Sequence, residues 1–288
     1  MMVSDIKINK AIEHFGNNGF YLLEGMFKRK DAENVACWLK SQDLEALATT
    51  WTDREPLVPL AVYQNVHQKD SPISDLVSNT EMLQLASQLI GEKVYIWSSK
   101  VNLKAAWYGT VEYPHQDYVY WNERGYENMN MMSCMIVLEP HGVKNGGLCV
   151  FPGSHNEGFI EHAPFINING LSKFTIPPVT LNQLEDKYGS ENIEASPGDV
   201  LFFHAGLVHG SSHNWSSQSR MIILSQLNTY NNKPTDVNRN SKEFNLKRAK
   251  TELEEAERRY FWFKRKYETQ LKADEVLFNS PIPKEEQT

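Results

Sequence analysis

The sequence predicts a mainly β fold with flanking helices, built around a jelly-roll core, also called a double-stranded β-helix. Short strand-like apolar segments follow one another between about residues 93 and 230, and turns containing glycine and proline separate them, a pattern typical of jelly rolls and antiparallel barrels. The chain of 288 residues also fits one large β-rich domain. We therefore expect residues 1–288 to form a single domain.

Composition limits the function classes. Hydrophobic residues make up 41% of the chain and supply a buried core, while the net charge of −7 gives no indication of a nucleic-acid or membrane partner. The odd number of cysteines, at Cys37, Cys134 and Cys149, predicts reduced thiols. The N-terminus lacks the features of a signal peptide, and no segment approaches the roughly eighteen apolar residues of a membrane span. We expect a cytoplasmic protein.

The N-terminal part, about residues 5–91, is predicted to be helical with one strand. Apolar side chains recur at helical spacing until Gly19, which precedes a strand-like segment at 20–23. Asp31 can cap a second helix, and a third is expected from Ser74 to Gly91. We expect these helices to pack on the outside of a sheet.

The segment Val94–Trp107 alternates between two kinds of side chain. Strand geometry places alternate residues on opposite faces. One face then carries Trp97, Ser99, Val101 and Leu103, and the other carries Ser98, Lys100, Asn102 and Lys104. A polar face in the middle of an apolar protein predicts the lining of a cavity.

Two core strands, Met131–Leu138 and Gly147–Phe151, flank a turn-forming segment at 141–147. The pair Asn145–Gly146 within it favours a tight reversal of the chain. The sequence therefore predicts that the two strands form a hairpin.

The stretch from Pro152 to about Ser196 has few periodic apolar residues. Loops of this length in compact domains usually cover or bind something, so it is a hypothetical lid. A turn at 197–199 then begins the strand 200–203, and 220–227 is a further strand.

Beyond Asn231 the sequence becomes highly charged and regains helical spacing. It predicts an amphipathic helix at about 242–271. This helix is expected to be an outer buttress or the face of a homodimer.

His115 and Asp117 stand two residues apart between strand-like segments. Residues at this spacing in a strand share a face, and a histidine with a carboxylate supplies two of the three ligands of a facial triad for non-heme Fe(II). Alone this pattern is weak, and a surface turn is the alternative. The best candidate for the third ligand is His209, with His213 as its competitor, and Arg220 follows eleven positions after His209.

The order of motifs is more specific than any one of them. His115-Gln-Asp117 precedes a glycine-rich segment at 145–155, then Pro197-Gly-Asp199, then His209 and Arg220. Over roughly residues 12 to 230 this order resembles the phytanoyl-CoA dioxygenase family of Fe(II)/2-oxoglutarate oxygenases, in its ectoine-hydroxylase-like branch. The resemblance implies a cupin-like jelly roll in which His115, Asp117 and His209 hold Fe(II). It also implies that Arg220 binds the distal carboxylate of 2-oxoglutarate, with O2 as the oxidant.

Further residues match the family less strongly. By resemblance, Asn102 and Ser133 would hydrogen-bond 2-oxoglutarate, and Lys104 is a weaker candidate for the same role. In each case the alternative is a polar residue that faces the cavity without binding a ligand. The carboxylate of Asp117 favours hydroxylation over halogenation, because halogenating relatives carry a small residue there.

Aromatic residues follow the aspartate. Trp121 matches a tryptophan that lines the substrate pocket of ectoine hydroxylase, and Tyr118 and Tyr120 lie beside it in the sequence. Such a wall can hold a cationic ligand by cation–π attraction. Ordinary core packing is the alternative.

The expected function is hydroxylation of an unactivated C–H bond in a small polar, amino-acid-like substrate, with release of succinate and CO2. No basic cluster suited to a coenzyme A tail is visible, and a natural-product intermediate is the second substrate class. Two other functions stay open. One is a catalytically silent cupin-like binding protein, against which Asp117 and Arg220 argue, and the other is a zinc hydrolase, for which no general base is evident.

Overall fold

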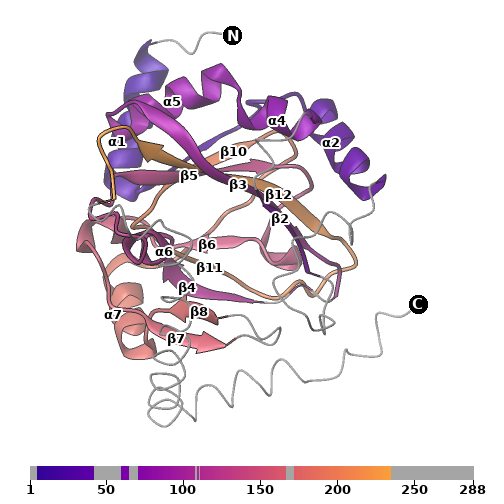
Figure 1. Cartoon of the computed structure of the whole chain (residues 1–288). Coiled ribbons are helices and arrows are strands. Elements are labelled where there is room, and N and C mark those ends of the chain that lie inside the picture. The colour runs from indigo at the N-terminus through magenta and orange to yellow at the C-terminus, as the bar shows by residue number, and fades with distance from the viewer. Residues whose placement is uncertain are drawn as a thin grey trace, which may run out of the picture.

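The computed structural model describes residues 5–41, 60–64, 71–107, 109, 111–166 and 172–234. Within them a six-stranded and a four-stranded antiparallel sheet lie one above the other, and helices cover the outer side of the larger sheet (Figure 1). Apolar side chains from both sheets, among them Met135, Val150 and Leu207, form a buried cluster between them. The predicted mainly β fold with flanking helices is confirmed.

The six-stranded sheet has the order β1-β10-β5-β12-β3-β2, and every neighbouring pair is antiparallel. One of its two central strands, β5, is buried along its whole length. The strands are β1 (Phe20–Leu23), β2 (Leu60–Gln64), β3 (Val94–Lys104), β5 (Met131–Val137), β10 (Val200–His204) and β12 (Arg220–Thr229).

The four-stranded sheet has the order β4-β11-β6-β9. It consists of β4 (Glu112–Gln116), β6 (Leu148–Val150), β9 (Glu191–Asn192) and β11 (Val208–Ser211). A separate two-stranded sheet, β7 (Ala163–Ile166) with β8 (Ser172–Thr175), is attached to β4 by the bond from Ile176 N to Pro114 O, 2.8 Å long.

Four helices pack on the six-stranded sheet: α1 (Asp5–Asn18), α2 (Arg29–Ser41), α4 (Pro72–Val77) and α5 (Thr80–Ile90). The prediction of one continuous helix from Ser74 to Gly91 was wrong, because the helix is interrupted between α4 and α5. The side chain of Asn79 accepts a hydrogen bond from Met82 N and so caps a new helix. Gly91 ends α5 with φ of 76°, in the left-handed region that favours glycine.

Strand β3 carries a bulge that changes its predicted faces. The register with β12 skips Trp97, pairing Ser98 with Gln226 and Ile96 with Leu227. Ile96 therefore joins Val101 in the core under the helices, whereas Trp97 packs against the aromatic residues near α6 (Tyr118–Asn122). The assumption of strict alternation placed Trp97 on the wrong face of the strand. The extra residue in the bulge reverses the faces on which the side chains before it lie.

The predicted hairpin of strands 131–138 and 147–151 was wrong. Strand β5 pairs with β10 and β12, whereas β6 pairs with β11 and β9. The segment between them closes on itself, since Gly147 N bonds to Gly142 O and Asn145 bonds to both Gly142 N and Pro140 O. Asn145–Gly146 thus turns the chain inside a crossover from one sheet to the other.

The stretch from Pro152 to Ser196 has more regular structure than predicted. It contains the short 3-10 helix Ser154–Glu157, strands β7, β8 and β9, and α7 (Pro178–Tyr188). Closure over a substrate stays a prediction for this stretch. The predicted C-terminal helix at 242–271 lies outside the described residues.

The cysteines are free, as predicted: Cys37 is exposed, Cys134 is buried and Cys149 is half-buried. None of the helices in the described ranges is long and apolar enough to cross a membrane.

Candidate metal centre

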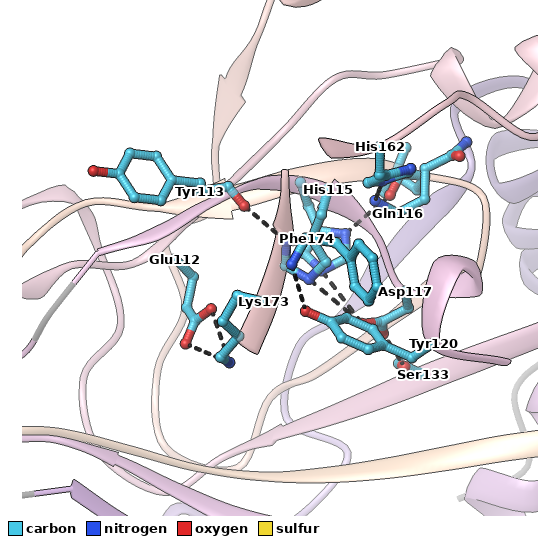
Figure 2. Close-up of polar contacts among 12 residues, drawn as sticks. Glu112, Tyr113, His115, Gln116, Asp117, Tyr120, Ser133, His162, Lys173 and Phe174 are labelled. Atoms are coloured by element: carbon cyan, nitrogen blue, oxygen red, sulfur yellow. Dashed lines mark hydrogen bonds and ion pairs between the residues drawn. The ribbon is translucent and has the colours of Figure 1, made fainter. Parts of the chain in front are cut away.

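Two adjacent strands of the smaller sheet bring the proposed ligands together. His209 of β11 is the direct antiparallel partner of His115 of β4, so both imidazoles project from the same face. Asp117 follows the end of β4 in a helical conformation (φ −54°, ψ −31°) that begins α6. The turn of the chain there brings the Asp117 carboxylate close to the His115 ring (Figure 2).

The ligand atoms converge within coordination reach. Asp117 Oδ1 lies 3.7 Å from His115 Nε2 and 3.8 Å from His209 Nε2. One potential ligand atom from each residue lies within 4.8 Å of the others, and all three residues are buried. This is the one group of three such residues found in the described part of the chain.

The backbone fixes the tautomer of each histidine. His115 Nδ1 lies 2.8 Å from Tyr113 O, and His209 Nδ1 lies 2.9 Å from Leu207 O. A carbonyl can only accept, so each Nδ1 carries the proton and each Nε2 keeps a free lone pair directed at Asp117. Orientation of metal-binding histidines by such a bond is a general feature of metal sites.

Electrostatics favour the protonation states that a metal requires. Burial, followed by the nearby His115, lowers the pKa of His209 to about 4. Burial by itself raises the pKa of Asp117, but the nearby His115 and His209 outweigh it and hold this pKa well below its usual range. At neutral pH the site therefore offers a neutral imidazole from His209 and an ionised carboxylate.

A second layer of polar contacts holds the ligands. Ser133 Oγ of β5 donates to Asp117 Oδ2 at 2.7 Å, which leaves Oδ1 for the metal. Behind β4, Gln116 N donates to His162 Nε2 at 2.9 Å, and the Gln116 side chain bonds to Gly158 O and Gly206 O. Nothing in the sequence around His162 indicates this contact, because it joins residues far apart in the chain.

The arginine predicted to bind a dicarboxylate is buried, with 3% of its surface exposed. Arg220 begins β12, and its Nε is buried with no hydrogen-bond partner among the described residues. No carboxylate in the described part of the chain lies within ion-pair distance of its guanidinium. Burial lowers the pKa of Arg220 to about 10, although the charge of Glu112 opposes this. A buried and charged guanidinium without a partner among the described residues requires an anionic partner beyond them.

Lys104 lies beside Arg220, as its register partner on β3. Its Nζ donates to Ser211 Oγ at 2.8 Å and to Ser212 O at 2.6 Å. Burial, followed by Arg220, lowers the pKa of Lys104 well below its ordinary value. Gly146 is needed here as well, since a Cβ at that position would lie 2.7 Å from Lys104 Cδ. Sequence reasoning missed Ser211, although it stands two residues after His209 on the same strand.

A second pair of charges, Lys173 and Glu112, lies near the triad. Lys173 Nζ of β8 is 3.1 and 3.2 Å from the two carboxylate oxygens of Glu112 on β4 (Figure 2). The positive charge of Lys173 is the main factor that lowers the pKa of Glu112 against the opposing effect of burial. Sequence analysis did not select either residue.

The predicted aromatic residues occupy different environments. Trp121 has 1% exposure and packs edge-on to Trp97, and Tyr118 Oη donates to Tyr126 O. The Tyr120 ring is 6.0 Å from that of His115, and its hydroxyl is 3.4 Å from Phe174 N (Figure 2). Burial raises the pKa of Tyr120 to about 12. Of these three aromatic side chains, that of Tyr120 is the one positioned to contact a molecule bound near the triad.

The remaining candidates lie apart from the ligand atoms. Asn102 is half-buried on β3, and no hydrogen bond of its side chain is found within the described ranges. His204 packs against Phe15 and His155, and His213 Nδ1 contacts Gly109 O. Neither competes with His209 as third ligand.

Comparisons with known proteins agree with this geometry. A family model described as Phytanoyl-CoA dioxygenase (PhyH) matches residues 17–222. An L-proline trans-4-hydroxylase from Streptomyces griseoviridis is 29% identical over 179 residues, covering 58% of this chain and 67% of that enzyme. An ectoine dioxygenase from Bordetella bronchiseptica is 26% identical over 235 residues, covering 77% of this chain and 75% of the relative.

Solved structures show the same fold. The crystal structure of EctD from S. alaskensis with 2-oxoglutarate and 5-hydroxyectoine superimposes with a TM-score of 0.65 at 24% identity, covering 85% of each chain. The carbocyclase SnoK from nogalamycin biosynthesis gives a TM-score of 0.58 at 19% identity, covering 76% of this chain and 82% of its own. The predicted jelly-roll, cupin-like architecture is thereby confirmed.

Proposed function

The chain belongs to the phytanoyl-CoA dioxygenase family, and from that premise we propose that it hydroxylates an unactivated C–H bond of a small, polar, amino-acid-like substrate. Fe(II), 2-oxoglutarate and O2 take part, and succinate and CO2 are released. The enzyme class predicted from the sequence, an Fe(II)/2-oxoglutarate-dependent dioxygenase, is confirmed. The single observation that carries the assignment to these residues is the convergence of His115, Asp117 and His209 on one point.

The residues present fit both cofactors. Two imidazole nitrogens with free lone pairs and one carboxylate oxygen form a facial set for Fe(II), which leaves other coordination positions open. The unpaired Nε of Arg220 supplies the matching observation for 2-oxoglutarate, because its fork of donors suits a carboxylate. When bound, iron with 2-oxoglutarate supplies the oxidising power for C–H cleavage.

The protein's own residues would bind the metal and 2-oxoglutarate, orient them and exclude water from the site. His115 Nε2, Asp117 Oδ1 and His209 Nε2 would hold the metal, and Ser133 would fix the carboxylate of Asp117 by its hydrogen bond. Arg220 would neutralise the distal carboxylate of 2-oxoglutarate, with Lys104 beside it. A contact between Asn102 and the co-substrate stays a prediction.

The substrate class rests on the relatives. Their names identify enzymes that act on L-proline and on ectoine, both small amino-acid-like molecules. Tyr120 would contact the substrate first, and Tyr118 and Trp121 would shape the wall behind it. We also propose that the enzyme works in the cytoplasm. A homodimer through residues 242–271 stays a prediction.

Anaerobic titration tests this function directly. Fe(II) and 2-oxoglutarate together should give the weak visible charge-transfer band of the chelate, and Fe(II) with succinate should not. Succinate release should then be measured in air with mixtures of metabolites. Absence of the band with tight zinc binding would indicate the catalytically silent binding protein instead.

A further inference from the structure

Lys100 of β3 lies on the strand face that looks toward the four-stranded sheet. The orientation follows from its neighbours: Val101 packs in the core under the helices, so the residues on either side of it point the opposite way. Lys104, four residues along on the same face, reaches across to Ser211 of β11. Lys100 is half-buried in the same interior.

The charges around Lys100 are those of the candidate site. Burial lowers the pKa of Lys100, and the charges that act on it most strongly are those of Asp117, Lys173 and Glu112. Asp117 is engaged by two histidines and Ser133, and Glu112 is engaged by Lys173. Within the described ranges, Lys100 itself has no carboxylate within ion-pair distance and no hydrogen-bond acceptor.

A charge balance over the proposed complex leaves this lysine unmatched. Fe(II) is neutralised by Asp117 and the chelating carboxylate of 2-oxoglutarate, and Arg220 is neutralised by the distal carboxylate. Glu112 and Lys173 neutralise each other. Lys104 is already bonded to two neutral oxygens. Among the described residues, Lys100 is then the half-buried cation of this interior that still lacks an anionic partner, and a charge shielded from water without one is unfavourable.

We propose that Lys100 binds a carboxylate of the primary substrate. This inference rests on the proposed function and narrows its substrate class to carboxylic acids. The carboxylate would lie against β3, between the triad and the Glu112–Lys173 pair, and the C–H bond to be oxidised would then face the metal ligands. Amides, esters and amines of the same shape would leave Lys100 unpaired and would bind poorly.

Matched pairs of small molecules test the proposal with the wild-type enzyme alone. The probes are the proteinogenic L-amino acids, their carboxamides, and ectoine. Each is added anaerobically to the enzyme loaded with Fe(II) and 2-oxoglutarate, and the shift of the visible band is recorded, followed by succinate release in air. We expect responses from one or a few carboxylates and none from the corresponding carboxamides. An equal response to acid and amide overturns the proposal, and so does a panel without any response.

Variants of Lys100 then test whether the preference for carboxylates depends on this residue. K100Q should weaken the response to the active carboxylate by about 30-fold or more, as expected for loss of one partner of a buried charge pair. K100R should retain most of it. K187Q is the matched control, because Lys187 pairs with Glu157 at the surface and should behave like wild type. An active carboxylate that binds K100Q as tightly as wild type overturns the role of Lys100.

The failure of this inference differs from failure of the proposed function. If the band with Fe(II) and 2-oxoglutarate forms but carboxylates are not preferred, the dioxygenase assignment stands and the role of Lys100 falls. If the band does not form in the wild-type protein, the proposed function itself falls.

Discussion

The two sheets contribute different chemistry to the site. The four-stranded sheet and the residue after β4 provide His115, Asp117 and His209, whose ligand atoms already converge and whose remaining polar atoms bond to backbone carbonyls and to Ser133. The six-stranded sheet instead provides cations, and among these Arg220 and Lys100 lack an anion in the described part of the chain. The metal end of the site is therefore preorganised, whereas we propose that anionic small molecules complete the cationic end.

The largest expected effect comes from replacing one of the proposed metal ligands carried by the four-stranded sheet and the residue after β4. His209→Ala, His115→Ala or Asp117→Ala should abolish retention of Fe(II) and succinate production, because two ligands cannot replace a facial set of three. The metal content of purified, iron-loaded protein measures the first effect. His213→Ala is the control, since this histidine lies nearby in sequence but contacts Gly109 O. A variant that keeps iron and wild-type turnover would remove its residue from the triad.

On the six-stranded sheet, Arg220→Ala should weaken 2-oxoglutarate binding while iron is retained. Loss of a charge-assisted pair in a desolvated site costs about 2–5 kcal/mol, or roughly 30-fold or more in affinity. Titration of the visible band against 2-oxoglutarate gives the dissociation constant. Lys104→Gln should have a smaller effect, because its ammonium group bonds to serine and carbonyl oxygens. If the Arg220 variant keeps wild-type affinity for 2-oxoglutarate and the Lys104 variant does not, Lys104 and not Arg220 binds the co-substrate.

Ser133 connects the sheets, and its loss should have an intermediate effect. Ser133→Ala removes the donor to Asp117 Oδ2 and frees the carboxylate to rotate, and such outer contacts are worth about 10- to 100-fold in metal affinity. Fe(II) affinity under anaerobic conditions is the measurement. Ser225→Ala is a matched control from β12, because Ser225 Oγ is buried without a partner in the described residues. Equal metal affinity in both variants would show that Asp117 needs no support.

Sequence reasoning succeeded where chemistry is encoded by close spacing or by motif order. His115 and Asp117 follow from their two-residue spacing, and His209 from its place in the ordered motifs. The pairing of His115 with His209 across β4 and β11 could not be predicted, because it joins strands almost a hundred residues apart.

The errors have local causes. Asn145–Gly146 is a strong turn signal, but a turn does not determine which sheets the flanking strands enter. Alternation along β3 failed at Trp97 because a bulge leaves little trace in sequence. Lys100 was visible as part of a polar face, yet its importance depends on which neighbouring charges are already paired, and only the three-dimensional arrangement gives that.

The smallest expected effect is on the pH dependence of the free energy of unfolding in the iron-free protein. It distinguishes a histidine of one sheet from a histidine of the other. Burial, followed by His155, lowers the pKa of His204 on the six-stranded sheet to about 4, below the roughly 6.5 of an unfolded chain. Between these values the unfolded state binds a proton that the native state does not, so the free energy of unfolding falls as pH decreases from about 6.5 to about 4. The slope per histidine is at most about 1.4 kcal/mol per pH unit.

His209 on the four-stranded sheet should contribute to the same slope, and bound metal should extend this contribution to lower pH, because a ligated imidazole cannot take up a proton. His204→Asn keeps an acceptor for Gly206 N and removes the titration, so it should reduce the slope with and without iron, as measured by urea unfolding across this pH range. The exposed His14→Asn is the control. Iron should extend the contribution of His209 to lower pH and leave that of His204 unchanged, because only His209 is a proposed ligand. An iron effect that disappears in the His204 variant would show that the two sheets do not act independently.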